Sequence, residues 1–173
     1  LSELNKIVKD DAIIVSDVGQ HQMWAAKYGK FPLGKSFITS AGLGTMGFGL
    51  PAAIGAQIGN PDKRVVCICG DGGFQMNIQE MATAVQHELP ITIVIINNSF
   101  LGMVREMQHF FYNKNYSGTC LRKRKSCNNK CQFDDKNIPH SCPPYTPDFV
   151  KLAESYGAYG MRVDKEDEIN KAL

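Results

Sequence analysis

The sequence predicts an α/β fold, with a doubly wound, mainly parallel sheet and helices on both faces. Two observations support this class. Short runs of β-branched and other apolar residues alternate along the chain with helical patterns, which is the order of elements in a parallel α/β sheet. One run, residues 91–96, is apolar on both faces, as expected for a central strand that helices cover on either side.

Helices and strands are expected to alternate, each marked by its own pattern. The strands are short β-branched and apolar runs, at residues 12–15, 36–39, 64–69, 91–96 and 158–163. Apolar residues recur with helical spacing between these runs, at residues 1–9, 21–28, 51–58, 77–87 and 147–156. The ends of the last helix are marked most clearly. Thr146 is a suitable N-cap, Pro147 fits the first turn, and Gly157 follows the last residue.

Composition excludes several classes of protein. Hydrophobic residues make up 43% and charged residues 21%, as in ordinary globular proteins, so a disordered or fibrous chain is not expected. The formal net charge of +2 is too small to predict nucleic-acid binding. No apolar stretch is long enough to cross a membrane, and no secretory leader opens the chain. Six cysteines without a leader favour reduced thiols and a cytoplasmic location.

The two ends of the chain predict a fragment. The chain starts at Leu1 without an initiator methionine, and a helix start at residues 165–169 is cut short at Leu173. Its length of 173 residues suits one domain or a piece of a larger protein. We therefore expect residues 1–173 to be a single domain taken from a longer polypeptide.

An irregular, basic and cysteine-rich segment at about residues 112–146 interrupts the alternation. It lacks apolar periodicity and carries the basic run Arg122-Lys123-Arg124-Lys125 with three prolines, which favours a solvated surface insertion. Four cysteines fall here, namely Cys120, Cys127, Cys131 and Cys142. With His140 nearby they could bind zinc or an iron–sulfur cluster, or form disulfides on oxidation, although no CxxC pair is present. This second metal or redox site remains an open alternative.

Polar residues follow two of the expected strands. Gly70-Asp71-Gly72-Gly73 comes after the strand at 64–69, and Asn97-Asn98 comes after the strand at 91–96. Ligands bind at the carboxyl ends of strands in open α/β sheets, and the glycines let the backbone approach an anion closely. A carboxylate, an amide oxygen and a loop carbonyl suit Mg²⁺ together with phosphate oxygens. Either half alone would be an ordinary turn; together they predict a metal–diphosphate clamp.

These residues resemble the motif of the thiamine-diphosphate enzymes, which has a Gly-Asp-Gly triplet, a spacer and a pair of asparagines. Three longer segments are similar to the large catalytic subunit of acetolactate synthase, at residues 19–26, 42–53 and 97–104. The resemblance covers most of residues 12–110 and resumes at 147–149. In that family, this stretch is the carboxy-terminal, diphosphate-binding domain of a three-domain subunit.

The resemblance implies the metal ligands and the diphosphate contacts. Asp71 and Asn98 would bind Mg²⁺ through their side chains, and Phe100 would add its backbone carbonyl. Gln20 and His21 would hold the diphosphate. Backbone amides around Gly72 and Gly73 would help them.

The same resemblance implies residues around the reacting end of the cofactor. Gly44 lies in the glycine-rich cofactor segment, and Met46 would sit beneath the thiazolium ring and keep the cofactor bent. Met103 and Val104 would line the substrate side. Met107 stands where many synthases carry a tryptophan tied to preference for the larger acceptor. The catalytic glutamate of the family lies on a neighbouring subunit and not in this chain, so the isolated fragment is expected to have little activity.

The activity implied is a thiamine-diphosphate- and Mg²⁺-dependent condensation of two pyruvates to 2-acetolactate and CO₂, or of pyruvate with 2-oxobutyrate. This carboligase (transferase) reaction is the first common step of branched-chain amino-acid biosynthesis, toward valine and isoleucine. The family also implies a homo-oligomer, a dimer or tetramer, whose subunits share active sites, and a possible regulatory small subunit. Its FAD, where present, binds a middle domain that this chain does not include.

Other functions are weighed beside this one. Another thiamine-dependent decarboxylase or carboligase, or a subunit of a 2-oxoacid:ferredoxin oxidoreductase, would use the same clamp. A metal- or redox-binding module would depend on the cysteine-rich segment. A dinucleotide site at residues 42–47 lacks the acidic residue that its GxGxxG pattern needs. Cys67 and Cys69 are expected in the core, and Met23 and Trp24 are interpreted as core residues of a helix face.

Overall fold

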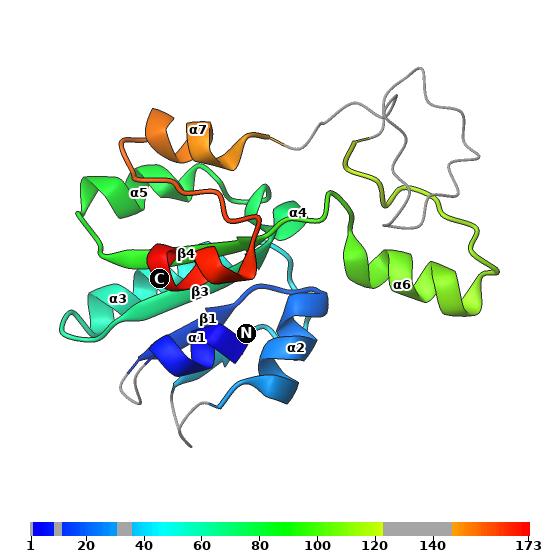
Figure 1. The fold of residues 1–173 in the computed structure, drawn as a ribbon, viewed down its shortest axis with the longest axis horizontal. Coiled ribbons are helices and arrows are strands. Elements are labelled where there is room, and N and C mark those ends of the chain that lie inside the picture. Colours follow the sequence, from blue (N-terminus) through cyan, green and yellow to red (C-terminus); the bar gives the residue numbers. More distant parts are fainter. Residues whose placement is uncertain (1, 9–11, 31–35, 123–146) are drawn as a thin grey trace.

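The structure is a computed structural model, and it describes residues 2–8, 12–30, 36–122 and 147–173 (Figure 1). Four strands form one parallel sheet in the order β2-β1-β3-β4. They are β1 (Ile13–Ser16), β2 (Phe37–Thr39), β3 (Val65–Gly70) and β4 (Ile91–Ile96). The predicted parallel sheet is therefore confirmed, and these strands begin and end within one residue of their expected positions.

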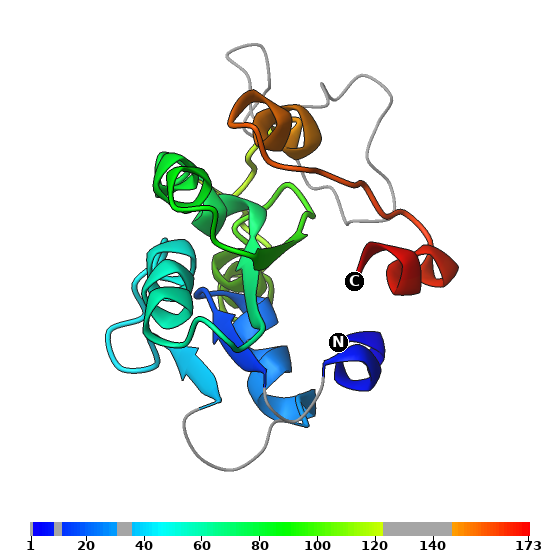
Figure 2. The same cartoon turned by 90° about the vertical axis from the view of Figure 1, so that its left-hand side faces the viewer.

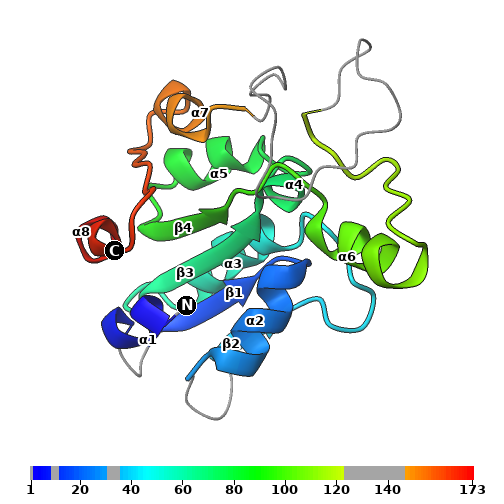
Figure 3. The same ribbon diagram turned by 45° about the vertical axis from the view of Figure 1, so that its right-hand side comes forward.

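Helices cover both faces of the sheet, as the sequence predicts (Figures 2 and 3). The helices of the described residues are α1 (Ser2–Ile7), α2 (Gln20–Tyr28), α3 (Gly49–Gly59), α4 (Asp71–Phe74), α5 (Glu80–Gln86), α6 (Gly102–Phe111), α7 (Phe149–Ser155) and α8 (Ile169–Ala172), with a 3₁₀ turn at Glu166–Glu168. None of them is long and apolar enough to span a membrane.

Alternate residues of the central strands build two cores. Ile13, Val15 and Cys67 point to one face, where they pack with residues of α3, α5 and α7. Ile14 and Val66 point to the other face, toward Leu4 of α1 and Ala25 of α2, with Leu173 beside them. Because successive side chains of a strand face opposite sides, an apolar run such as β1 can be buried on both.

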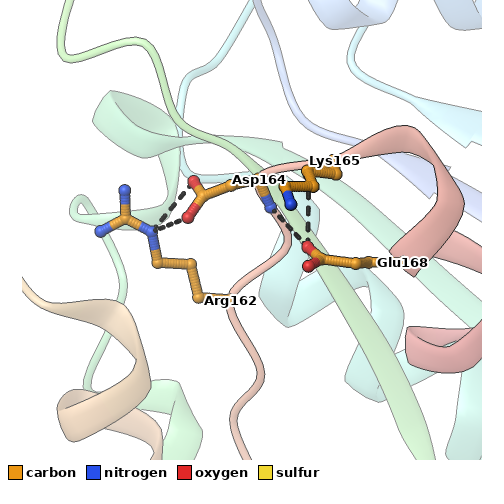
Figure 4. Close-up of polar contacts among 4 residues, drawn as sticks. All are labelled: Arg162, Asp164, Lys165 and Glu168. Atoms are coloured by element: carbon orange, nitrogen blue, oxygen red, sulfur yellow. Dashed lines mark hydrogen bonds and ion pairs between the residues drawn. The ribbon is translucent and has the colours of Figure 1, made fainter.

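The strand expected at residues 158–163 is wrong. Among the described residues, β4 pairs only with β3, and residues 158–163 have no partner in the sheet. Local side-chain contacts shape the end of this segment (Figure 4). Arg162 Nε donates to both carboxylate oxygens of Asp164 at 3.0 and 2.8 Å, and Glu168 Oε2 accepts from the backbone N–H of Asp164 and Lys165 at 3.1 and 3.3 Å. These contacts lead into the short helical end that the sequence predicts near residue 165.

Helix boundaries differ from expectation in three places. Helix α4 occupies residues where a turn was expected, and α6 occupies residues for which no element was predicted. The N-cap of α7 is Asp148, which accepts from the N–H of Val150 and Lys151 at 3.2 Å each; Thr146, the expected cap, lies outside the described residues. Gly157 follows this helix with φ of +83°, in agreement with its predicted role as the end signal.

The described start of the cysteine-rich segment packs against the rest of the chain. The N–H of Leu101 donates to the carbonyl of Thr119 at 2.8 Å, and the N–H of Leu121 donates to the carbonyl of Ser99 at 2.9 Å. Thr119 is buried. Residues 119–121 are thus held beside the loop that follows β4, rather than in solvent as the surface-insertion interpretation expects. Residues 123–146 lie outside the described part, and the extent of the domain stays a prediction.

Candidate cofactor site

A cleft with a volume of about 230 Å³ lies at the carboxyl ends of β1, β3 and β4. The strand order places it beside the junction of β1 and β3, where the chain reverses its direction of progress across the sheet, and α/β sheets bind ligands at such points. The cleft brings together nearly all the candidate residues: Gln20, His21, Gly44, Met46, Asp71, Gly72, Gly73, Asn98, Phe100, Met103 and Val104. Met107 is the exception; it lies on α6 but does not line the cleft.

Asp71 is a buried carboxylate on this cleft. It forms the first residue of α4, directly after β3, and is only 2% exposed. Its Oδ1 accepts from the N–H of Gly72 at 2.9 Å, and its Oδ2 accepts from the N–H of Ser99. Burial raises the pKa of Asp71, while these backbone donors oppose the rise. No cationic side chain of the described residues pairs with it, so a bound cation would offset the cost of burying its charge.

The turn after β4 wraps around Asp71. Asn98 Oδ1 accepts from the N–H of Phe100 at 2.9 Å, and Ser99 adopts a left-handed conformation with φ of +65° while it donates to Asp71. An amide oxygen has two lone pairs, so Asn98 retains acceptor capacity beyond this bond. The predicted juxtaposition of Asp71 and Asn98 from neighbouring strands is therefore present.

His21 presents an unpaired ring nitrogen. The side chain is 6% exposed, and its Nε2 is buried without a hydrogen-bond partner in the structure. Glycines make room for the ring: a Cβ on Gly19 would lie 2.6 Å from its Cε1, and one on Gly70 would lie 3.0 Å away. Burial lowers the pKa of His21, with Asp17 acting in the opposite direction. An anion bound in the cleft would lie beside this ring and favour its protonated form.

Asp17 is a functional-site residue that the sequence analysis missed. Its buried carboxylate accepts three backbone N–H groups, from Val18 at 2.6 Å, Gly47 at 3.1 Å and Gly49 at 2.8 Å. These bonds attach the loop that carries Met46 to the end of β1. The position of Asp17 in the sequence could have indicated this role, because Asp17, like Asp71, follows a buried strand and is soon followed by a glycine.

Helix α6 borders the cleft with an exposed apolar surface. No residue of this helix is buried, and Val104 and Met107 are 48% and 51% exposed. Figure 3 shows α6 beyond the carboxyl ends of the strands, beside α2. On α2, Met23 and Trp24 are 45% and 41% exposed, so their interpretation as core residues is wrong; Trp24 instead lines the cleft.

The cysteines divide into two sets. Cys67 and Cys69 are buried in the core, as predicted, with their sulfur atoms 3.3 Å apart. Cys120 is half-buried and lies opposite Phe100 in an isolated antiparallel bridge. Cys127, Cys131 and Cys142 fall outside the described residues. Within the described ranges, no group of three or more His, Cys, Asp or Glu residues is arranged to hold a metal ion, and the cysteine site stays a prediction.

The residues present fit a diphosphate with a divalent cation. His21, whose buried Nε2 has no hydrogen-bond partner in the structure, lines the cleft, and the buried carboxylate of Asp71 lines it too without a cationic partner among the described residues. Buried backbone at Gly72 and Gly73 lines the same wall. Fold and site together define an α/β domain that binds an anionic cofactor at the carboxyl edge of a parallel sheet.

Comparison with known proteins specifies the class further. Residues 17–173 match the family model described as thiamine pyrophosphate enzyme, C-terminal TPP binding domain, and the chain belongs to this family. It is 42% identical over its whole length to the acetolactate synthase isozyme 2 large subunit of Escherichia coli (strain K12), covering 28% of that protein. It is 43% identical over its whole length to a probable acetolactate synthase large subunit of Methanococcus aeolicus, covering 25%. It is equally similar, at 43%, to the acetolactate synthase large subunit of Cyanidium caldarium, covering 26%.

The family resemblance noted in the sequence is thereby confirmed. The chain spans only about a quarter of the length of these relatives. Activity, substrates and assembly belong to the whole protein.

Proposed function

We propose that this chain is the cofactor-binding domain of an acetolactate synthase. The parent enzyme condenses two pyruvates to 2-acetolactate and CO₂, or pyruvate with 2-oxobutyrate, in branched-chain amino-acid biosynthesis. The observation that carries this proposal is the buried Asp71 carboxylate, which faces the cleft next to Asn98 without a cationic partner among the described residues. The similarity to large subunits along the whole chain supports it.

Different residues of the cleft would bind the metal ion and the diphosphate. Asp71 and Asn98 would hold Mg²⁺ through their side-chain oxygens, with the carbonyl of Phe100 as a third ligand. Hard oxygen ligands with room left for phosphate oxygens are what Mg²⁺ favours. His21 and Gln20 would hold the diphosphate together with backbone N–H groups at Gly72 and Gly73, and the helix terminus at α4 favours negative charge there.

The reaction would depend on the bound cofactor and on the conformation in which the domain holds it. Thiamine diphosphate supplies an electron sink for the carbon that loses CO₂. Met46 would support its ring and keep it bent, since the loop that carries Met46 is fixed to β1 through Asp17. Gly44 lines the cleft in that loop. Met103 and Val104 would exclude water on the substrate side, and Met107 would influence the choice of acceptor from outside the cleft.

The exposed apolar surface of α6 supports assembly with another subunit. Large apolar patches on a domain commonly mark interfaces. Here Val104, Met107, Phe110 and Phe111 are all about half or more exposed. A neighbouring subunit would cover them, complete the active site and bring the glutamate that acts on the cofactor. A homo-oligomer, a regulatory small subunit, FAD in another domain and a cytoplasmic location are further expectations for the parent enzyme.

The alternatives share the clamp and differ in the reaction. Other thiamine-dependent decarboxylases and carboligases would consume pyruvate without forming 2-acetolactate. A 2-oxoacid:ferredoxin oxidoreductase or a redox module would need cluster ligands among the four cysteines of the insertion, of which the structure describes only Cys120. No observation favours these alternatives over the synthase.

The test uses the full-length subunit with pyruvate, Mg²⁺ and thiamine diphosphate. We expect 2-acetolactate from the wild type and a loss of at least about 100-fold in Asp71→Ala, because a buried charged ligand is removed from the cation. Asp62→Ala is the matched control, since Asp62 is exposed in the turn before β3, at the opposite end of that strand from Asp71. Consumption of pyruvate without acetolactate would indicate another thiamine-dependent enzyme. Unchanged activity in Asp71→Ala would refute the clamp.

A further inference from the structure

A side-chain hydrogen bond connects the two helices that flank the cleft. Gln20, the first residue of α2, donates through Nε2 to Oε2 of Glu106 on α6 at 2.8 Å. The two residues are 86 positions apart in the sequence, and both are partly buried. Gln20 lines the cleft, whereas Glu106 does not. The bond therefore joins a candidate diphosphate ligand to a residue behind it.

The start of α6 is shaped to receive the Gln20 carboxamide. A Cβ at Gly102, the first residue of α6, would collide with Oε1 of Gln20, so a larger residue there would force the carboxamide to shift. The oxygen end of the carboxamide thus lies against Gly102, and its nitrogen end lies against Glu106 one turn further along. Both ends are fixed by the same helix, which limits the rotation of the amide group.

Nε2 of a primary amide carries two hydrogens. Glu106 accepts one of them, and the other remains available to a phosphate oxygen in the cleft. We propose that Glu106 is a positioning residue, which holds the Gln20 carboxamide with its second N–H directed at the diphosphate of the cofactor. This inference rests on the proposed function, because it takes the diphosphate as the ligand of the cleft.

The direction in which loss of the Glu106 carboxylate changes cofactor affinity distinguishes a positioning role from simple charge repulsion. A carboxylate near a diphosphate repels it, so removal of the charge alone would tighten binding. A positioning role predicts the reverse, because a freed glutamine loses conformational entropy each time the cofactor binds. Immobilising one such side chain corresponds to about a two- to tenfold change in affinity.

The experiment measures the Kd of thiamine diphosphate at saturating Mg²⁺ by isothermal titration calorimetry on the full-length subunit. We expect Glu106→Ala to raise the Kd about two- to tenfold. Glu106→Gln should bind at least as tightly as the wild type, since its amide oxygen still accepts from Gln20 and the repelling charge is removed. In a Gln20→Ala background, Glu106→Ala should have no further effect. Glu154→Ala is the control, because it removes an exposed carboxylate from α7, which packs beside α5 and away from the cleft.

Three results would overturn the inference alone. Unchanged or tighter binding in Glu106→Ala would mean that Glu106 does not position Gln20, and tighter binding would indicate charge repulsion instead. A lower Tm of the cofactor-free Glu106→Ala protein with an unchanged Kd would indicate a structural role alone. An equal loss in the Gln20→Ala background would mean that Glu106 acts by another route. Absence of thiamine diphosphate binding in the wild type would instead refute the proposed function, and this inference with it.

Discussion

Substitution of Asp17 by asparagine tests how the cofactor loop is held. The two carboxylate oxygens of Asp17 accept the N–H groups of Val18, Gly47 and Gly49 at 2.6 to 3.1 Å, and the side chain is fully buried. An asparagine of nearly the same shape offers one oxygen, and its NH₂ group would face a backbone donor. At least one buried N–H on the loop would then lose its acceptor.

The size of the effect follows from the kind of bond that is lost. A hydrogen bond to a charged group contributes about 1.5–3 kcal/mol to stability. About 1.4 kcal/mol corresponds to a factor of ten in an equilibrium constant. Local opening of residues 44–49 should therefore become between about tenfold and 100-fold more frequent in Asp17→Asn, because the substitution affects this loop before it affects the sheet.

Hydrogen–deuterium exchange with mass spectrometry on the cofactor-free, full-length subunit measures this opening directly. Peptides that cover Gly47 and Gly49 should exchange faster by the stated factor, and peptides of β3 should not. Asp148→Asn is the matched control, since Asp148 also accepts two backbone N–H groups but at the exposed start of α7. Unchanged exchange at Gly47 and Gly49 in Asp17→Asn would refute the assignment of Asp17 as the residue that fixes the loop.

Three further substitutions test the glycine-rich loop and the buried histidine. Gly47 has φ of +86°, and a Cβ there would lie 2.7 Å from Cβ of Met76, so Gly47→Ala should destabilise the protein by about 1–3 kcal/mol, seen as a lower Tm. Gly44 also has a positive φ, but a Cβ there would meet open space, so Gly44→Ala should lower the stability only by the smaller backbone strain. Equal losses of stability in the two variants would contradict the steric argument. Burial lowers the pKa of His21 below its usual value of 6.5, so the stability that its neutral ring contributes is present above that value and lost as the pH falls through the lowered pKa. The Tm of the cofactor-free wild type should thus fall more steeply below about pH 6.5 than that of His21→Asn; parallel curves would contradict this.

Strands could be predicted from the sequence where burial on both faces decided the outcome. Residues 91–96 are apolar at nearly every position, and β4 has the expected bounds. The run at 158–163 is interrupted by Gly160 and Arg162, and a strand also needs a neighbour for its backbone N–H and C=O groups, which a local pattern does not specify. Helix α6 was missed although Val104, Met107 and Phe111 recur at helical spacing in the sequence; what the sequence does not show is that these side chains stay exposed.

The cleft could be predicted because its geometry follows from topology. Parallel strands end at the same edge, so Asp71 and Asn98 had to meet once both strands were recognised. Contacts such as that between Gln20 and Glu106 could not be predicted, since they depend on how two helices lie against each other across 86 residues. The burial of Asp17 likewise depends on the return of residues 47–49 to the end of β1.

The two buried aspartates at this sheet edge differ in what their charges do. Asp17 directs both oxygens at N–H groups of its own chain and does not line the cleft, so its charge is used within the fold. Asp71 receives one N–H at each oxygen, lines the cleft, and has its pKa raised by burial. Its negative charge is therefore incompletely compensated by the protein, and a divalent cation in the cleft would complete the compensation. Strand ends that look alike in sequence thus separate into a structural carboxylate and a binding one, and access to the cleft decides which is which.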